Sequence, residues 1–302
     1  MTSAVDVCVA TFQRPELLAQ LLASLAQQCL QHDSLRIIVI DNDADGSARA
    51  TVEAFVPTAP VVEVVYDLEP VQSIALARNR ALLHLRGELF AFVDDDQTVA
   101  SDWLERLLAC MRRFDCDAVF GPVASALPAN APGWAASCFV RPQRPTGTPV
   151  RHGGAGNVLV RRTGIGAARF DPAFGLSGGE DTDLFFRMYQ RGCSMVWCAE
   201  ALAVESVPAA RLTLAWIRRR GFRDGQNYAR IFMRTQSGWY QAGWFVKKVA
   251  QLVIGVVLAP LLWCLSQRRY VILTVRLAAA SGQLSTVFSG KYLEEYRLPV
   301  RH

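Results

Sequence analysis

Three consecutive carboxylates, Asp94, Asp95 and Asp96, directly follow the apolar run Leu89 to Val93. Two like charges 4 Å apart repel each other by about 4 kcal/mol at the effective dielectric of a protein surface. A turn can use one aspartate as a helix cap, but it has no need of three. The cluster is tolerable if it is fully solvated or if positive charge lies among its members. The pattern therefore favours a site that receives positive charge over a simple surface turn.

A second acidic group, Glu180, Asp181 and Asp183, follows Gly178 and Gly179 at the start of a predicted helix. Acidic side chains in the first turn of a helix are favoured by its dipole, by roughly 0.3–1 kcal/mol each. That effect accounts for one or two of these acids. It does not account for the two glycines immediately before them, so we regard this group as a second candidate site.

Apolar strands alternate with helices through the first half of the chain. The predicted strands are Val5–Thr11, Leu35–Asp41, Val61–Asp67, Leu89–Asp94 and Asp117–Val123. Nearly continuous apolar strands separated by helices indicate an α/β fold with a mostly parallel sheet covered on both faces. Ligands of such sheets bind beyond the carboxyl ends of the strands, where Thr11, Asp41, Asp67 and the three consecutive aspartates fall.

Two later segments are rich in turn-forming residues. The stretch from Leu127 to Pro149 contains many Pro, Ala and Gly residues and is predicted to be a loop. The stretch from His152 to Gly164 combines a glycine-rich turn with a short strand, and it lacks the motifs of known phosphate loops. We expect its glycines to permit a tight turn or a close approach of the backbone to a ligand.

Composition limits the classes of protein. The chain has 302 residues, 51% of them hydrophobic, and a formal net charge of +5, which is too small to indicate nucleic-acid binding. None of the eight cysteines forms a Cys-x-x-Cys pair, so we expect reduced core cysteines in a cytosolic protein. The N-terminal residues show no basic leader before an apolar segment, and we expect this part to stay in the cytoplasm.

Six segments, taken in order, resemble family 2 glycosyltransferases with the GT-A fold, especially bacterial exopolysaccharide enzymes of the succinoglycan-biosynthesis type. They read VATFQRP, VIDNDADG, ALARNRAL, FAFVDDDQ followed by DWL, GGAGNVLVRR, and FGLSGGEDTDLFFR. One such motif is weak evidence, whereas six in the right order are specific. The resemblance covers Val5 to Val207 and implies a GT-A catalytic domain over residues 1–207, followed by a helical region over residues 208–302.

The resemblance implies an inverting transfer of a sugar from a nucleotide-diphosphate sugar to a hydroxyl of a glycan or lipid-linked acceptor. Asp181 matches the general base, with Glu180 beside it, and Asp96 with Asp94 matches the site of Mg²⁺ or Mn²⁺. The implied contacts to the nucleotide sugar are Thr11, Asp41, Arg78, Asn79, Asp94 and Asp95. These roles are chemically reasonable, because hard cations prefer oxygen ligands and an acceptor hydroxyl needs a carboxylate to take its proton.

The chain departs from the family pattern at two places. Many relatives read Pro-Thr-Tyr-Asn after the first strand, where this chain reads ATFQRP, so different contacts to the base are expected. Many also have a metal-assisting His after the base, where this chain has Glu205 in LAVESVP. No His is therefore assigned to the metal. The four histidines, which we expect to be surface or packing residues, are His32, His84, His152 and His302.

The composition changes after Val207. The segment from Ala210 to Arg234 mixes seven arginines with aromatic and aliphatic residues. It is compatible with a solvated basic helix or with a helix at an anionic membrane surface that lends an arginine to the diphosphate. The apolar segments Val249–Leu265 and Tyr270–Phe288 follow, the second containing Arg276.

The first apolar segment has about 17 residues, which is near the lower limit for crossing a bilayer. Basic residues lie on both sides of it, Lys247 and Lys248 before and Arg268 and Arg269 after, which disfavours a single span. We predict an interfacial or re-entrant hairpin that holds a peripheral, monotopic enzyme on the cytoplasmic side of the inner membrane. A two-span hairpin and a soluble helical cap or dimer surface are the alternatives.

Two other functions were weighed. An Asp-dependent phosphohydrolase would need a lysine and a further acidic pair at set positions, and we cannot place them in the sequence. A catalytically inactive membrane scaffold would be expected to have lost an acidic motif, and both are present. The donor sugar, the nucleotide base, the acceptor, the linkage and the oligomeric state are not encoded in these motifs.

Overall fold

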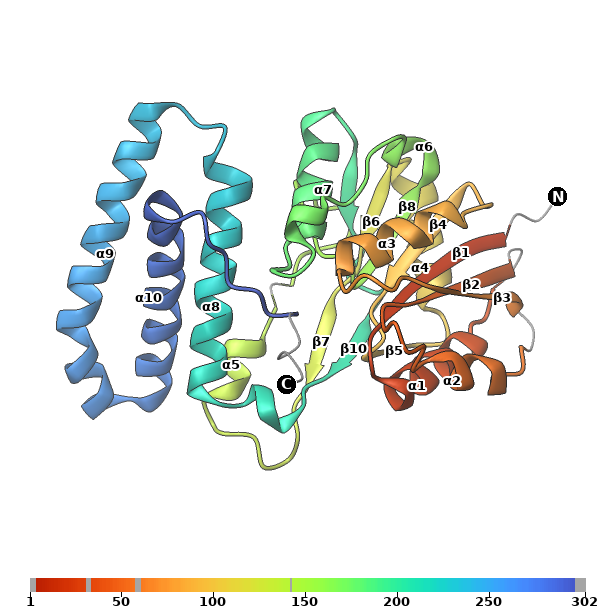
Figure 1. The fold of residues 1–302 in the computed structure, drawn as a ribbon, viewed down its shortest axis with the longest axis horizontal. Coiled ribbons are helices and arrows are strands. Elements are labelled where there is room, and N and C mark those ends of the chain that lie inside the picture. The colour runs from red at the N-terminus through yellow and green to blue at the C-terminus, as the bar shows by residue number, and fades with distance from the viewer. Residues whose placement is uncertain (1–3, 31–33, 58–60, 142, 297–302) are drawn as a thin grey trace. The chain divides into compact units, whose positions relative to one another are not determined.

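The computed structural model describes residues 4–30, 34–57, 61–141 and 143–296. These residues form two compact units (Figure 1). The first unit comprises the described residues of Met1–Ala124 and Arg141–Ser206, together with Tyr296. The second comprises Ser125–Val140 and Val207–Glu295. Each unit is considered by itself below.

A seven-stranded sheet is the centre of the first unit. Its order is β3 (Val61–Leu68), β2 (Ser34–Asp41), β1 (Ala4–Thr11), β4 (Leu89–Val93), β8 (Asn157–Arg161), β6 (Ala118–Phe120) and β9 (Met195–Trp197). Pairing is parallel from β3 to β4 and between β6 and β9, whereas β8 runs antiparallel to both of its neighbours. The predicted mostly parallel α/β sheet is therefore confirmed, and β8 is its one reversed strand.

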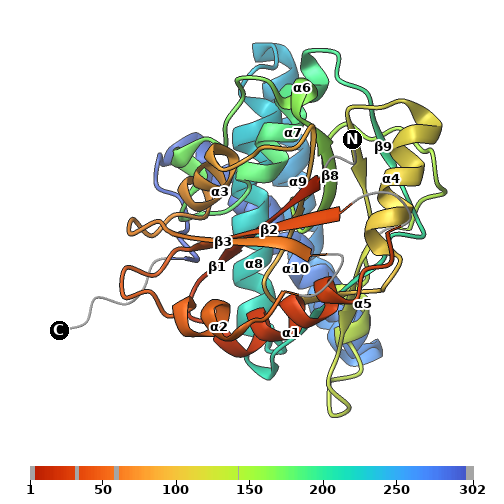
Figure 2. The same ribbon diagram turned by 90° about the vertical axis from the view of Figure 1, so that its right-hand side faces the viewer.

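Alternate residues of the central strands face two separate apolar layers, as the pleat of a strand requires. Val7 points to the layer that contains α1 (Pro15–Ala26) and α4 (Trp103–Phe114). Cys8 and Phe92 point to the layer that contains α3 (Ile74–Leu83) and α7 (Glu180–Gln190). Figure 2 shows α1 and α3 on opposite faces of the sheet. The short elements α2 (Arg49–Ala54), α6 (Arg162–Ile165) and η1 (Pro172–Phe174) complete the cover.

A second, three-stranded sheet adds an element that the sequence pattern did not reveal. It consists of β5 (Gln97–Val99), β10 (Ala203–Ser206) and β7 (Val123–Ala126), in that order. β5 begins directly after Asp96, and its Gln97 lies opposite Glu205 of β10. The turn of three aspartates is thus held between a strand of the large sheet and a strand of the small one.

The second unit is helical. It contains η2 (Ala209–Arg211), α8 (Leu214–Tyr228), the π-helical turn η3 (Ala229–Met233), α9 (Gly238–Leu265) and α10 (Gln267–Phe288). It also contains α5 (Ala135–Phe139), a short helix within the stretch from Leu127 to Pro149, which we had predicted to be a loop. The apolar residues of α5 explain the difference, because Ala135 and Phe139 are buried with Ile217 and Val271 in the core of this unit.

The backbones of α8 and α10 lie in direct contact. A Cβ added to Gly225 would lie 2.0 Å from the carbonyl oxygen of Ala279, and one added to Gly282 would lie 1.9 Å from that of Phe222. By length and composition, α9 and α10 could each cross a membrane. Most of the apolar side chains of α9 are exposed.

Candidate functional site

The turn that follows β4 holds its three aspartates in different environments. The Asp95 side chain is buried, and it accepts hydrogen bonds from Thr11 Oγ1 at 2.8 Å and from Arg14 Nη1 at 3.0 Å. The Asp94 side chain is 41% exposed and pairs with Arg78. Asp96 is close to its two neighbours and to Glu205. Burial, followed by these negative charges, raises the pKa of Asp96 to about 7.

Arg14 also contacts this turn, although no role was predicted for it from the sequence. Its Nη1 atom donates to Asp95 and also to Asp96 Oδ2, at 3.1 Å. Arg14 lies between β1 and α1, in the QRP segment that follows the first strand. The sequence could have identified Arg14 by its position. It precedes Pro15 and follows the carboxyl end of a central strand, at the edge of the sheet where the acidic residues were predicted.

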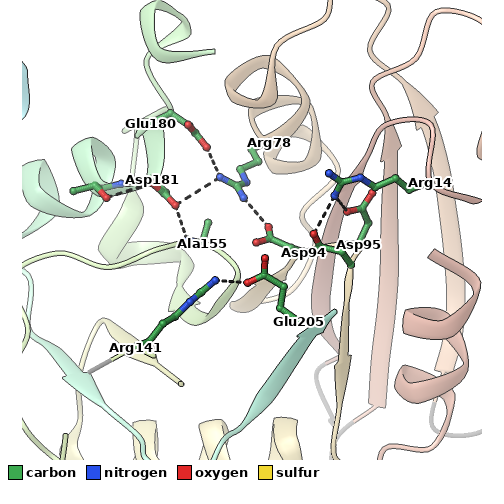
Figure 3. A network of polar contacts seen from close by, with 11 residues as sticks. Arg14, Arg78, Asp94, Asp95, Arg141, Ala155, Glu180, Asp181 and Glu205 are labelled. Atoms are coloured by element: carbon green, nitrogen blue, oxygen red, sulfur yellow. Dashed lines mark hydrogen bonds and ion pairs between the residues drawn. The ribbon is translucent and has the colours of Figure 1, made fainter. Parts of the chain in front are cut away.

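Arg78 joins the two acidic groups (Figure 3). This residue of α3 is buried, and its guanidinium pairs with Asp94 Oδ1 at 2.8 Å, with Glu180, and with Asp181 Oδ2 at 4.0 Å. The negative partners of Arg78 raise its pKa further above its ordinary range, although burial lowers it. One buried positive charge thus serves three carboxylates from two distant segments of the chain.

The first turn of α7 carries the second acidic group. Gly178 and Gly179 have φ values of +73° and +93°, in the left-handed region that favours glycine. They deliver Glu180 to the buried side of the helix, where it is 3% exposed and burial raises its pKa to about 7. Among the described residues, Glu180 Oε2 has no hydrogen-bond partner. The glycines therefore set the direction in which α7 presents its acids.

Asp181 is held in a different way from Glu180. Its side chain is 22% exposed. The backbone amide of Ala155 donates to Oδ2 at 3.1 Å, and the amide of Thr182 donates to Oδ1 at 2.6 Å. Backbone amides fix the carboxylate in place, while its exposure leaves it within reach of a bound molecule. Of the two adjacent acids, Asp181 is the one that is placed to accept a proton from a ligand.

The glycine-rich turn before β8 lies between the two groups. A Cβ on Gly156 would lie 2.4 Å from Asp94 Oδ2, and one on Gly154 would lie 3.4 Å from Asp181 Oδ2. The sequence predicted that glycines here permit a close approach of the backbone. In the structure the approach is to these two carboxylates.

Two acids at strand ends are tied up in local interactions. Asp41 is fully buried and accepts hydrogen bonds from the amides of Asp43 and Ala48 and from the Tyr66 hydroxyl. Asp67 pairs with Arg80 and His84. Although burial raises the pKa of Asp67, hydrogen bonds from both partners and from the Leu68 amide lower it to about 2.

Asn79 is likewise used within the protein. Its side-chain amide donates to the carbonyl oxygen of Phe170 and accepts from the Phe170 amide, both at 2.8 Å. Asn79 therefore ties α3 to the segment before η1. Of the predicted nucleotide-binding residues, Thr11, Arg78, Asp94 and Asp95 belong to the polar network around the two acidic groups. The hydrogen bonds described for Asp41 and Asn79 lie outside it.

Glu205, noted in the sequence only as the place where relatives have a His, lies beside the acidic turn. It forms an ion pair with Arg141, and the amide of Ser206 donates to the Asp96 carbonyl oxygen at 3.1 Å. Of the histidines, His84 pairs with Asp67, and burial, more than Arg144, lowers the pKa of His152. His32 and His302 lie outside the described residues.

The acidic turn has the donor chemistry of a site for Mg²⁺ or Mn²⁺. It offers carboxylate oxygens, the ligands that hard cations prefer. Burial is the main cause of the raised pKa of Asp96, and the neighbouring carboxylates Asp94, Asp95 and Glu205 add to it. Within the described parts of the chain, no group of three or more His, Cys, Asp or Glu side chains is arranged to hold an ion. A cation at this turn would need further oxygen ligands from a bound anionic molecule or from water.

Comparison with solved structures defines the class of protein. The chain is similar to the mannosyltransferase PcManGT from Pyrobaculum calidifontis, in complex with GDP-Man and Mn²⁺, with a TM-score of 0.61 and 17% identity over 97% of this chain and 77% of that one. It is also similar to TarS 1–349 from S. aureus, in complex with UDP-GlcNAc, with a TM-score of 0.56 and 14% identity over 94% and 92% of the two chains. The fold is thus the GT-A fold of nucleotide-sugar transferases, as the motifs predicted.

Sequence comparison then defines the family. Residues 6–172 match the model of Glycosyl transferase family 2. Over 296 residues the chain is 36% identical to Succinoglycan biosynthesis protein ExoM of Rhizobium meliloti, covering 97% of this chain and 95% of that protein. A shorter match, 29% identical over 110 residues, is to the putative glycosyltransferase EpsH of Bacillus subtilis, over 35% of this chain and 30% of that protein. The chain belongs to glycosyl transferase family 2, which confirms the resemblance noted in its sequence.

Proposed function

We propose that this glycosyltransferase transfers a sugar with inversion, from a nucleotide-diphosphate sugar to a hydroxyl of a glycan or lipid-linked acceptor in exopolysaccharide synthesis. One observation carries the proposal: the two acidic groups are joined through Arg78, so a cation site and an exposed, amide-held carboxylate lie in the same part of the first unit. The relatives support the substrate class, since ExoM is a succinoglycan biosynthesis protein and the solved neighbours were determined in complex with UDP-GlcNAc and GDP-Man.

In this proposal Asp181 is the general base. Its exposed carboxylate takes the proton of the acceptor hydroxyl while the Ala155 and Thr182 amides keep it oriented. Burial prevents Glu180 from meeting the acceptor in the same way, and its contact with Arg78 gives it a supporting role in catalysis. Inversion then follows from a single displacement, with the acceptor attacking from the face of the sugar opposite to the diphosphate.

The donor binds at the acidic turn. Asp96, with Asp94, would hold Mg²⁺ or Mn²⁺, which when bound neutralises charge on the departing diphosphate. Thr11, Arg78 and Asp95 line the nucleotide sugar, while Asp41 and Asn79 contribute by fixing the loops around it. The negative charge around Asp96 supports the presence of a cation in the working enzyme.

The catalytic test is an assay of the full-length protein with a panel of nucleotide sugars and lipid-extract acceptors, followed by mass measurement of the product. Transfer of one sugar, lost with EDTA and restored with Mn²⁺, is the expected result. Phosphate release without a sugar product would favour the phosphohydrolase instead. The anomeric configuration of the product, read by NMR, tests inversion directly.

We also propose that the helical unit holds the enzyme on the cytoplasmic face of the inner membrane without crossing it. α10 packs backbone to backbone against α8, which carries Arg218, Arg219, Arg220 and Arg223. An α10 that crossed the bilayer would draw this charged helix into hydrocarbon, where each charged group is costly. The packing therefore favours an interfacial arrangement over two spans.

α9 provides the surface for such an arrangement. Its exposed apolar side chains include Val253, Ile254, Val257, Leu261 and Trp263. The helix has 28 residues, about 42 Å at 1.5 Å per residue, whereas the hydrocarbon core is about 30 Å thick. A helix of this length lies along an interface without mismatch, and the neighbouring basic residues suit anionic lipid headgroups.

Two exposed cysteines allow a test of this topology. Cys264 lies at the end of α9, and Cys29 lies in the first unit. In oriented membrane vesicles, a membrane-impermeant maleimide should label both cysteines from the same side. Labelling of Cys264 only from the side opposite to Cys29 would contradict the interfacial arrangement and favour a two-span hairpin.

A further inference from the structure

The loop between β1 and α1 places Arg14 in a constrained position. Gln13, just before it, has a φ of +53°, in the left-handed region that non-glycine residues adopt only under strain. Pro15 then begins α1, and its ring fixes the backbone after Arg14. Strain on one side and a rigid residue on the other direct the arginine toward the acidic turn.

The contact made by Arg14 is unusual in that one nitrogen serves two carboxylates. Nη1 lies 3.0 Å from Asp95 Oδ1 and 3.1 Å from Asp96 Oδ2. The two aspartate side chains are 6% and 10% exposed, whereas that of Arg14 is 37% exposed. Arg14 is thus the most exposed member of these ion pairs, while both carboxylates are largely shielded from water.

We propose that Arg14 is a positioning residue that occupies the place of the divalent cation in the free enzyme and gives up Asp96 when the ion binds. The inference rests on the proposed metal dependence. A cation bound by Asp96 would repel the guanidinium, because both are positive and both need the same carboxylate. The exposure of Arg14 allows it to move away without opening the core.

Two consequences follow from this exchange. Without the ion, Arg14 keeps Asp95 and Asp96 together against their mutual repulsion, so the turn retains its shape. With the ion and the donor present, the displaced guanidinium gains the diphosphate as a new anionic partner. Arg14 therefore opposes the binding of the ion alone and stops opposing it when the nucleotide is present.

Arg80 offers a matched control. It is another partly buried arginine of the same unit, 36% exposed, and it pairs with Asp67 and Glu69 outside the acidic turn. Replacing either arginine by glutamine removes one positive charge and two ion pairs. Only the replacement at residue 14 removes a competitor for Asp96.

The experiment measures the binding of Mn²⁺ by electron paramagnetic resonance in the full-length wild type, Arg14→Gln and Arg80→Gln, with and without UDP or GDP. Without nucleotide, Arg14→Gln should bind Mn²⁺ about tenfold more tightly than the wild type, a factor that corresponds to about 1.4 kcal/mol. Arg80→Gln should bind like the wild type. With nucleotide, the advantage of Arg14→Gln should disappear. Arg14→Lys keeps the positive charge, and we expect its affinity for Mn²⁺ to lie between those of the wild type and Arg14→Gln.

Equal or weaker binding of Mn²⁺ by folded Arg14→Gln would overturn the inference, since Arg14 would then only support the turn. If Arg14→Gln does not fold, an affinity of Arg14→Lys at or below that of the wild type has the same meaning. A different pattern marks failure of the metal proposal itself: no Mn²⁺ binding by any protein with nucleotide, and sugar transfer that persists in EDTA.

Discussion

The two acidic groups of this enzyme are stabilised by different means. The turn after β4 is compensated mainly by arginine side chains, since Arg14 bridges Asp95 and Asp96 and Arg78 holds Asp94. Asp181, at the start of α7, is held by backbone amides of Ala155 and Thr182. Side-chain partners can exchange for other cations, whereas backbone amides stay where the fold puts them.

This difference agrees with the two proposed tasks. A cation site must release its counter-charges when the ion enters, and mobile arginines permit that. A general base must hold one orientation through the reaction, and amide hydrogen bonds provide it. Arg78 contacts both groups and is the residue through which a change in one group reaches the other.

The largest expected effect is that of Asp181→Asn on turnover. The asparagine side chain keeps the size of the aspartate and can accept from one of the two backbone amides, Ala155 or Thr182, but it cannot take a proton. We expect the turnover number to fall by about 10²–10⁴-fold, the usual contribution of general base catalysis. Binding of Mn²⁺ and of the nucleotide sugar, measured by calorimetry, should remain at the wild-type level. Turnover close to that of the wild type would remove Asp181 from the mechanism.

Asp96→Ala should also abolish transfer, but through the other group. Here the affinity for Mn²⁺ should fall with the activity, because a proposed ligand is gone while the amide-held base is intact. Asp102→Ala, the loss of a half-exposed acid at the start of α4, serves as the control for charge. If Asp96→Ala retained Mn²⁺ binding, it would be wrong to assign the cation to the turn after β4 and the general base to the start of α7.

Arg78→Gln tests whether Arg78 links the two acidic groups. The quantity measured is the stability of the protein. Removing one partner from a buried charge network typically costs about 3–5 kcal/mol, since the remaining charges stay buried and unpaired. Of the three carboxylates paired with Arg78 only Glu180 is buried, so we expect a loss near the low end of this range in the free energy of unfolding, measured with urea. Arg80→Gln, in a more exposed pair, should cost far less. Equal losses would mean that the network does not act as a unit.

Much of the fold followed from residue patterns. Apolar strands such as Leu35–Asp41 and the Asp94–Asp96 turn after β4 were predicted, because continuous burial and strand ends leave clear signals in the sequence. The reversed strand β8 was expected only as a short strand of unknown direction. Its antiparallel insertion brings Gly156 to Asp94, and no local pattern encodes such long-range pairing.

The candidate site was predicted less completely than the fold. Strand ends identify acids at the right edge, but the sequence does not say which partners they find there. Asp41 and Asp67 fit the rule and are nevertheless satisfied by local hydrogen bonds and ion pairs. Arg14 and Arg141 bind acids more than 60 positions away, and such pairs become visible only when the chain is folded.

The smallest expected effect concerns pH and contrasts the two adjacent acids of α7. Burial raises the pKa of Glu180 from an ordinary value of 4.5 to about 7, although the positive charge of Arg78 lowers it. Between these two values the folded protein keeps a proton that the unfolded chain has lost. The folded state then binds more protons than the unfolded state, so this group lowers the free energy of unfolding as the pH rises through that window.

Glu180→Gln removes the titrating group and keeps the shape of the side chain. The free energy of unfolding of the variant, measured in urea from pH 5 to pH 8, should therefore fall less with rising pH than that of the wild type, and the variant should gain relative stability toward pH 8. Glu16→Gln, at an exposed acid in the first turn of α1, controls for the loss of one charge. Parallel curves for the wild type and Glu180→Gln would show that Arg78 keeps Glu180 ionised. The Glu180 carboxylate would then carry its negative charge throughout the range from pH 5 to pH 8.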